Sequence, residues 1–308
     1  MEAINISNEI GVKQVKYTSS DDMSFIGTWN LLIKNLDDHA AGVTELMKNS
    51  ASAMVRARKK ENERQCILFL KNSKKKNLIG FLDFVGMERN AFLKLKKLND
   101  PDAALGKNAK EHDVWGGHGN GGKIYAAKMF NKGFWYTLKD KKFNHGGYHT
   151  DYVTNVRNIK NKEKFKFKYA DEQHVTNGIK KLEALLKPFD VHFKQLPGEI
   201  INLIKEKKNF TFFIGEDNEN IKSKELTKNI LEDAEAEEPL FYISLNIYEN
   251  GKPLKEKKNN SFIFRPENIP PHKEFMVPRK FDIPDKLIDP KTHKEVSFIN
   301  SKDKYFVI

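Results

Sequence analysis

The chain has 308 residues, with 54 Lys and Arg against 42 Asp and Glu and a formal net charge of +12. This length suits one large domain or two smaller ones, and it is sufficient to bury a core without disulfides or structural metals. With 39% hydrophobic and 31% charged residues, the composition excludes an intrinsically disordered chain.

Three features of the sequence bear on its compartment and partners. The single cysteine, Cys66, excludes an intramolecular disulfide and favours a reducing compartment. No apolar run approaches the ~20 residues that a membrane span requires, and the first residues lack the pattern of a signal peptide. We therefore expect a cytoplasmic protein without membrane contact. The lysines are spread over Lys/Asn-rich loops, which is typical of solvated surface, so the charge leaves nucleic-acid binding open without predicting it.

The first third of the chain predicts a helix, a β-hairpin and a long connection. Apolar residues recur at helical spacing from about Asp37 to Arg58. The apolar runs Cys66–Leu70 and Leu78–Phe84 flank a polar, Lys-rich turn, as in a hairpin. Residues 88–122 contain one short helical stretch and end in glycines. A connection of this length inside a compact domain is usually functional.

The remaining elements follow in chain order. We expect a helix over Lys123–Phe130 that Gly133 ends, a strand over Phe134–Leu138, an edge strand over Phe165–Tyr169, helices over Gly178–Leu186 and Glu199–Lys207, and strands over Phe210–Ile214, Leu240–Tyr248 and Ser261–Phe264. The highly charged stretch 216–239 is the best candidate boundary. We therefore predict a first domain over residues 1–235 and a β-containing, proline-rich extension over residues 236–308.

Two residues of the first predicted helix are candidates for phosphate chemistry. Glu45 and Asn49 are four residues apart, so they lie on one helix face, one turn from each other. A carboxylate can take a proton from water, and an amide oxygen can bind Mg²⁺. Taken alone, the pair also fits an ordinary surface Glu and Asn on an amphipathic helix.

Two further segments carry a similar signal. Asp83 ends an apolar strand, where it can accept a hydrogen bond from an exocyclic amine, and Gly86 lets the backbone approach a flat ligand. Residues 116–123 place five glycines within seven positions directly before a predicted helix, and Lys123 follows them. Backbone N–H groups, the helix N-terminus and the lysine charge together favour phosphate binding. The spacing is neither that of a Walker loop nor that of a Rossmann fingerprint.

The order of these segments resembles the GHKL ATPases, the superfamily of gyrase, heat-shock chaperones, MutL and the MORC proteins, with histidine kinases as distant relatives. Glu45 and Asn49 look like its N-box, and Asp83 with Gly86 and Met87 looks like its adenine-binding box. The loop is similar to that of the MORC branch. Through this resemblance the nucleotide-binding residues would be Asn49, Asp83, Gly86, Met87, Gly117, Gly119, Asn120, Gly121, Gly122, Lys123 and Thr211.

The resemblance implies a two-layer α/β sandwich of the Bergerat type, with a mixed, mostly antiparallel sheet. It implies that ATP and Mg²⁺ are bound, with Asn49 holding the metal. Glu45 would polarise the attacking water and Lys123 would neutralise phosphate charge in the transition state. Slow hydrolysis would close a lid formed by residues 88–122. It would also clamp two copies together through their N-terminal segments, on a client protein or on nucleic acid.

The sequence departs from the family pattern at the adenine-binding box. Asp83 and Met87 are four positions apart instead of five, Phe84 replaces the first glycine, and Leu82 occupies the position in strict register. Either the loop is one residue shorter and Asp83 still reaches the adenine, or the acidic contact is lost. We favour the first, because Asp83 ends the strand.

Two other functions are compatible with the same resemblance. One is the catalytic domain of a histidine-type protein kinase, against which Glu45 argues, because a water-activating carboxylate suits hydrolysis. The other is a nucleic-acid-binding module that uses nucleotide as a structural ligand, which salt-dependent DNA binding without ATPase activity would favour.

Overall fold

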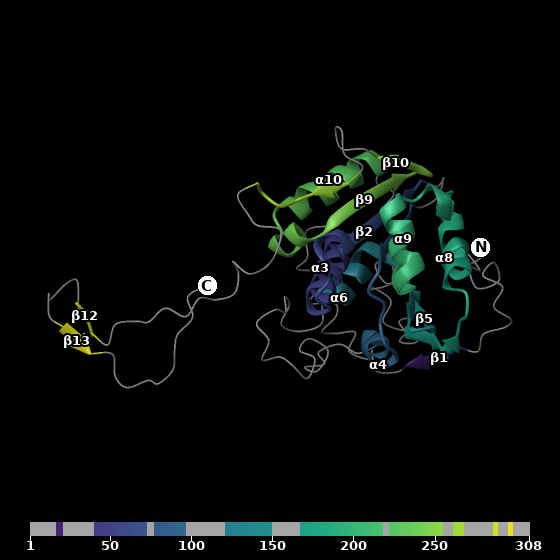
Figure 1. Ribbon diagram of the computed structural model, residues 1–308, viewed down its shortest axis with the longest axis horizontal. Helices are drawn as coiled ribbons and strands as arrows, with labels where there is room; N and C mark the ends of the chain where they lie inside the picture. Colours follow the sequence, from purple (N-terminus) through teal and green to yellow (C-terminus); the bar gives the residue numbers. More distant parts are fainter. Residues whose placement is uncertain are drawn as a thin grey trace, which may run out of the picture.

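Paired apolar strands form the centre of the fold (Figure 1). The computed structural model describes residues 17–20, 40–72, 77–96, 121–149, 167–217, 222–254, 261–267, 286–288 and 295–297. The predicted hairpin is confirmed, because β2 (Gln65–Lys71) and β3 (Leu78–Asp83) pair antiparallel, with Cys66 opposite Asp83.

These two strands belong to a sheet of eleven strands in the described residues. Nine strands follow one another in the order β1-β6-β5-β4-β8-β3-β2-β9-β10, while β7 pairs with β5 and β11 pairs with β9. The other members are β1 (Tyr17–Ser20), β4 (Phe130–Lys139), β5 (Lys142–His149), β6 (Phe167–Ala170), β7 (Gln173–His174), β8 (Phe210–Asp217), β9 (Ser244–Glu249), β10 (Lys252–Leu254) and β11 (Phe262–Ile263). The pair β2 and β9 is parallel, and the other pairs are antiparallel. A separate two-stranded sheet joins β12 (Lys286–Ile288) and β13 (Glu295–Ser297).

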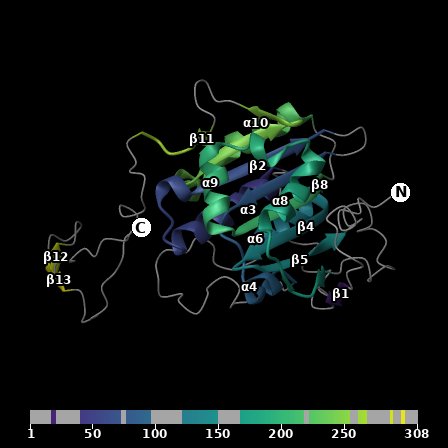
Figure 2. The same ribbon diagram turned by 45° about the vertical axis from the view of Figure 1, so that its right-hand side comes forward.

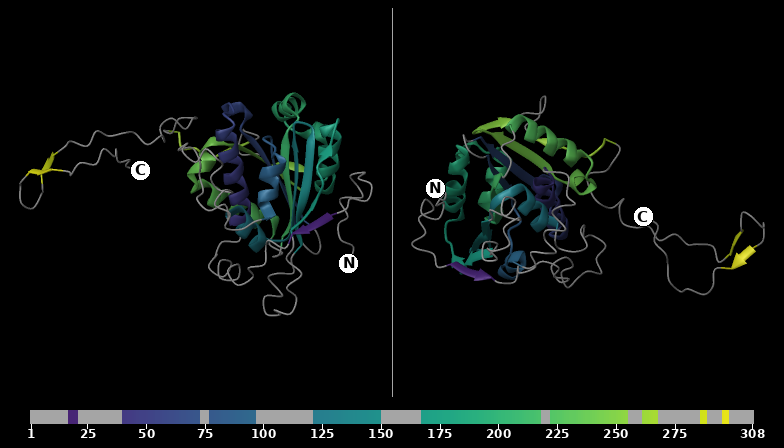
Figure 3. Two further views of the ribbon diagram at one scale, coloured as in Figure 1. Left: turned by 90° about the horizontal axis from the view of Figure 1, so that it is seen from below. Right: turned by 180° about the vertical axis from the view of Figure 1, so that it is seen from behind.

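Successive side chains of a strand point to opposite sides of the sheet. Helices cover both sides, so the sheet separates two hydrophobic cores. Leu68 and Phe81 pack into one core with α3 (Ala41–Arg56), α4 (Arg89–Leu93), α6 (Gly121–Met129) and α10 (Ser223–Glu235). Phe69 and Leu82 pack into a second core with α8 (Gly178–Leu186) and α9 (Gly198–Lys207). Views from below and behind show the two groups of helices on opposite sides of the strands (Figure 3).

Helices α3 and α6 pack against each other at close range. A Cβ atom added at Gly42 would lie 2.6 Å from the Cβ of Met129, so only glycine permits this approach. Val43 and Met47 of α3 and Ala126 of α6 are completely buried. The helix that carries Glu45 and Asn49 therefore forms one unit with the helix that follows the glycine-rich loop (Figure 2).

The prediction of an α/β fold with a mixed, mostly antiparallel sheet is confirmed. Helices α3 and α6 cover one face of the sheet, and α8 and α9 cover the other. The predicted division at residue 235 falls just before η5 (Glu238–Tyr242), and β9, from beyond that division, pairs with β2 in the same sheet.

Two predictions of local structure are wrong, and one helix was not predicted. Gly133 lies inside β4 and does not end a helix; it is glycine because an added Cβ would lie 2.9 Å from the rings of Phe213 and Tyr148. The predicted edge strand is β6, which lies between β1 and β5. The charged stretch 216–239 contains α10, whose buried Leu226, Ile230 and Ala234 recur every four residues.

Candidate functional site

Asp83 lies at the C-terminal end of β3 and is the buried acidic centre of the candidate site. It is only 6% exposed, and its carboxylate accepts hydrogen bonds from the Ser50 hydroxyl at 2.6 Å and the Val85 N–H at 3.0 Å. Burial raises the pKa of Asp83 above its usual value, while Ser50 and the backbone N–H groups of Val85, Gly86 and Thr211 act in the opposite direction. The geometry therefore holds a desolvated carboxylate at the end of a rigid strand.

Leu82 and Asp83, the two candidates for the acidic position of the predicted adenine-binding box, face opposite sides of the sheet. Leu82 packs into the core with α8 and α9, on the face of the sheet away from α3. Asp83 points to the opposite face, where Ser50 of α3 reaches it. A register that used Leu82 would place an apolar side chain away from α3, so the shorter loop with Asp83 fits the fold.

Gly86 and Met87 form a tight turn against the neighbouring strands. Gly86 has a φ of +74°, and an added Cβ would lie 2.4 Å from the Leu138 carbonyl oxygen, so the turn requires glycine. The Met87 N–H donates to the Thr137 hydroxyl at 2.6 Å. The backbone here is therefore held closely against β4.

Thr137 is a member of the cluster that sequence reasoning missed. Its hydroxyl lies 3.2 Å from that of Thr211 and donates to the Phe210 carbonyl at 3.2 Å. Thr137 and Thr211 are opposite each other on β4 and β8, and Asp83 is opposite Thr211 on β3. The signal was a lone threonine in an otherwise apolar run, which alone does not indicate a site.

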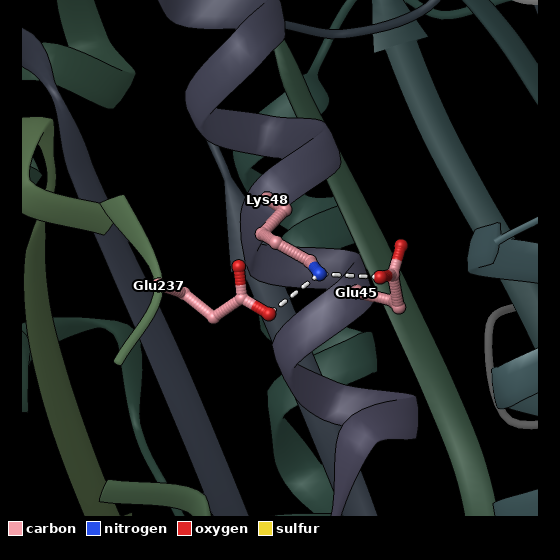
Figure 4. A network of polar contacts seen from close by, with 3 residues as sticks. All are labelled: Glu45, Lys48 and Glu237. Atoms are coloured by element: carbon pink, nitrogen blue, oxygen red, sulfur yellow. Dashed lines mark hydrogen bonds and ion pairs between the residues drawn. The ribbon is translucent and has the colours of Figure 1, made fainter. Parts of the chain in front are cut away.

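The polar residues of α3 differ in their exposure to solvent. Asn49 is exposed on α3, and Ser50 beside it is buried against Asp83. Glu45 is paired with Lys48 at 2.5 Å, and Lys48 also contacts Glu237 at 2.9 Å (Figure 4). Neither Lys48 nor Glu237 was expected at the site.

The helix after the glycine-rich loop begins within this region. Gly121 and Gly122 form the first turn of α6, and Lys123 is buried there, with 7% exposure. The other predicted loop residues, Gly117, Gly119 and Asn120, lie outside the described residues. The structure thus brings together α3, the turn at Gly86 and Met87, Thr211 and the start of α6, and it leaves the rest of the loop undescribed.

The first part of the predicted lid is fixed to the sheet. Arg89 donates to the Asn144 side chain and to the Ala170 carbonyl, both at 2.8 Å, and Phe92 is fully buried against Phe167. Residues 89–96 form α4 and η2 (Lys94–Lys96), so a lid that moves would have to begin beyond them. Residues 97–120 lie outside the described part of the chain.

The described residues contain no group of three or more His, Cys, Asp or Glu side chains that could hold a metal by itself. A single exposed amide at Asn49 suits Mg²⁺ only when phosphate oxygens and waters supply the other ligands, as they do for nucleotide-bound magnesium. Within the described part of the chain, no helix is both long and apolar enough to cross a bilayer.

No protein-family model matches the chain, and no curated protein matches it. The case for its function therefore depends on the residues and their geometry.

Proposed function

We propose that the protein binds Mg·ATP and hydrolyses it slowly, in the manner of the GHKL ATPases. The observation that carries this proposal is the cluster of Ser50, Asp83, Gly86 and Thr211, in which Ser50 donates to the buried Asp83 and Thr211 lies opposite it in the sheet. Its members come from three segments far apart in the sequence, and the resemblance assigned each of these segments to the nucleotide on pattern alone. If the match to the family pattern were accidental, there would be no reason for these three segments to lie in contact in the fold.

Asp83 is suited to bind the adenine. An ionised carboxylate accepts hydrogen bonds without donating any, which matches the exocyclic amine of adenine. Ser50 and Val85 donate to different oxygens of the carboxylate and fix its position before a ligand arrives, and the turn at Gly86 and Met87 offers backbone to the flat ring. Preorganisation of this kind reduces the free-energy cost of binding.

The phosphates would extend from this floor along α3 to the start of α6. Asn49, one residue from Ser50, would ligate the magnesium ion, which neutralises phosphate charge when bound. Lys123 and the N–H groups of the first turn of α6 would supply further positive potential. Glu45, one turn before Asn49, would take a proton from the attacking water.

Calorimetry and phosphate release with the purified full chain test this proposal. We expect ATP binding that strengthens with Mg²⁺, and slow release of inorganic phosphate. Glu45→Gln should retain ATP binding and lose turnover by roughly 10²- to 10⁴-fold, the contribution of a positioned general base. Asn49→Ala should lose the magnesium-dependent part of binding.

The exposed Glu232 of α10, which pairs with Lys228 on its own helix, provides a matched control as Glu232→Gln. This variant should behave as wild type. No binding of ATP by the wild-type protein would refute the proposal. Transfer of the γ-phosphate to the protein in place of its release would indicate a kinase, and wild-type turnover in Glu45→Gln would place the base elsewhere.

A further inference from the structure

A lysine next to the proposed base is shared between two carboxylates. The Lys48 ammonium lies 2.5 Å from a Glu45 carboxylate oxygen on its own helix and 2.9 Å from a Glu237 oxygen (Figure 4). The three side chains are 22%, 18% and 33% exposed, so each is partly withdrawn from water. Ion pairs that are shielded from solvent are screened less by salt than exposed ones.

The charges in this group do not balance. Two carboxylates compete for one ammonium, so any change that removes Glu237 leaves Lys48 entirely to Glu45. Burial alone would lower the pKa of Lys48, but the hydrogen bonds and charges of Glu45 and Glu237 outweigh burial and raise it. Lys48 therefore stays protonated and acts as a fixed positive charge beside Glu45.

Glu237 belongs to a part of the chain remote from the N-box. It follows α10 and directly precedes η5, and both elements pack on α3. Pro239 and Leu240 of η5 are buried, so the segment is held against α3 by its apolar residues. A displacement of α10 or η5 along α3 would move Glu237 relative to Lys48.

Other charged groups also lie near α3. The titratable side chains that are not fully exposed on the elements packed against it are Asp83 on β3, Lys123, Tyr125 and Lys128 on α6, Asp233 on α10, and Glu237, Glu238 and Tyr242 at η5. The charges that act on Lys48 are those of Glu45 and Glu237. Glu45 and Glu237 are therefore the groups that set the charge environment of Lys48.

We propose that Lys48 is a positioning residue for Glu45 and that Glu237 shares it, so that the segment after α10 tunes the orientation of the hydrolytic base. This inference rests on the proposed function, because it treats Glu45 as the base. Release of Lys48 by Glu237 would leave the lysine to Glu45 alone and fix the Glu45 carboxylate more tightly. A tighter hold of Lys48 by Glu237 would leave that carboxylate less restrained.

The two partners of Lys48 predict opposite changes in turnover at constant affinity. In Lys48→Met the orientation of Glu45 is lost, so kcat at neutral pH should fall about tenfold, and Lys48→Arg should restore most of it. In Glu237→Gln kcat should rise, because Lys48 then serves Glu45 alone, and the same substitution made in Lys48→Met should have no effect. The Kd for ATP should stay unchanged in all these variants.

Lys228→Met is the matched control, since it removes a lysine from an exposed ion pair with Glu232 on α10. It should leave kcat as in wild type. A kcat that does not change in Lys48→Met and Glu237→Gln, in a protein that hydrolyses ATP, would overturn the inference and leave the proposed function intact.

A readout independent of turnover separates the two failures. The ¹³C carboxyl resonance that disappears in Glu45→Gln reports the surroundings of Glu45 directly. Its chemical shift at neutral pH should change in Lys48→Met and in Glu237→Gln, even if the wild-type protein proved inactive. A resonance unchanged in both variants would overturn the inference by itself.

Discussion

Replacing Asp83 by Asn tests the proposed adenine-binding end of the site. The wild-type carboxylate accepts from the Ser50 hydroxyl through one oxygen and from the Val85 N–H through the other. Asn retains one acceptor and gains a donor in place of the second. The hydroxyl of Ser50 can rotate to accept, whereas the Val85 N–H cannot, so we expect the amide nitrogen to face Ser50. The fold should tolerate this change, but adenine loses a charged acceptor.

The magnitude follows from the kind of hydrogen bond that is lost. A hydrogen bond to a charged group contributes about 1.5–3 kcal/mol, so the Kd for adenine nucleotides should rise about ten- to hundredfold. Stability has two opposing contributions, since one hydrogen bond weakens and the cost of a buried charge disappears. We therefore expect the unfolding free energy to change by less than about 2 kcal/mol.

The pH dependence of stability has a definite sign. Burial raises the folded-state pKa of Asp83 above the unfolded value near 3.8, so the folded protein binds more protons between the two values. Wild-type stability should accordingly fall as the pH rises through this window, and Asp83→Asn should lack that fall. Urea unfolding at several pH values measures the difference.

Titration calorimetry with Mg·ATP and with ADP measures the binding loss. Asp140→Asn provides a control, because Asp140 is an exposed turn residue with a positive φ that Asn adopts readily. This control should bind as wild type. Wild-type affinity in Asp83→Asn, with unfolding behaviour intact, would show that adenine is not bound at Asp83.

Three further predictions concern the turn, a buried histidine and the lid. Gly86→Ala should destabilise the protein by roughly 2 kcal/mol or more, because the new Cβ meets the Leu138 carbonyl at a positive φ. Gly198→Ala, which meets nothing within 4 Å, should be neutral or mildly stabilising; equal losses in thermal unfolding would refute the strain. Burial, with nearby Lys181 and Arg89, lowers the pKa of His145 to about 4, so stability should drop by about 3 kcal/mol as the pH falls from 6.5 to 4. His145→Gln should remove most of that drop in urea titrations. Trypsin cleavage within residues 97–120 should slow with a non-hydrolysable ATP analogue and slow less with ADP; equal rates would remove the lid from the mechanism.

Local patterns were enough to predict the elements that carry the site. The hairpin of β2 and β3 follows from two apolar runs around a Lys-rich turn, and α6 follows from a helical run directly after glycines. In both cases the deciding residues are neighbours in sequence. The structure starts α6 at Gly121, two residues earlier than expected.

The sequence did not predict elements whose formation depends on tertiary contacts. Strand β5 contains Gly146 and Gly147, which suggest a loop, yet an added Cβ at Gly147 would lie 2.0 Å from the Gly133 carbonyl oxygen. The two glycines permit close strand contact that no local pattern reveals. Helix α10 was not predicted because most of its residues are charged or polar, although its apolar residues do repeat at helical spacing.

The same division applies within the site. Asp83 and Gly86 lie within one motif and were predicted from it. Lys48 meets Glu237 across 189 positions of sequence, and Thr137 meets Met87 across 50. Contacts over such separations depend on the sheet order, which the sequence alone did not provide.

Under the proposed function, the geometry also predicts where ATP and ADP are distinguished. The floor around Asp83 is held by buried hydrogen bonds, and both nucleotides present the same adenine to it. Asp83→Asn should therefore weaken ATP and ADP by the same factor. A ligand can shift a conformational equilibrium only through contacts that differ between the two states. Any switch must consequently depend on the γ-phosphate, at the end of the site where Glu45, Lys48 and the first turn of α6 lie. This is also the region that Glu237 reaches from the segment after α10, so a change at the γ-phosphate and a change in that segment would act on the same base.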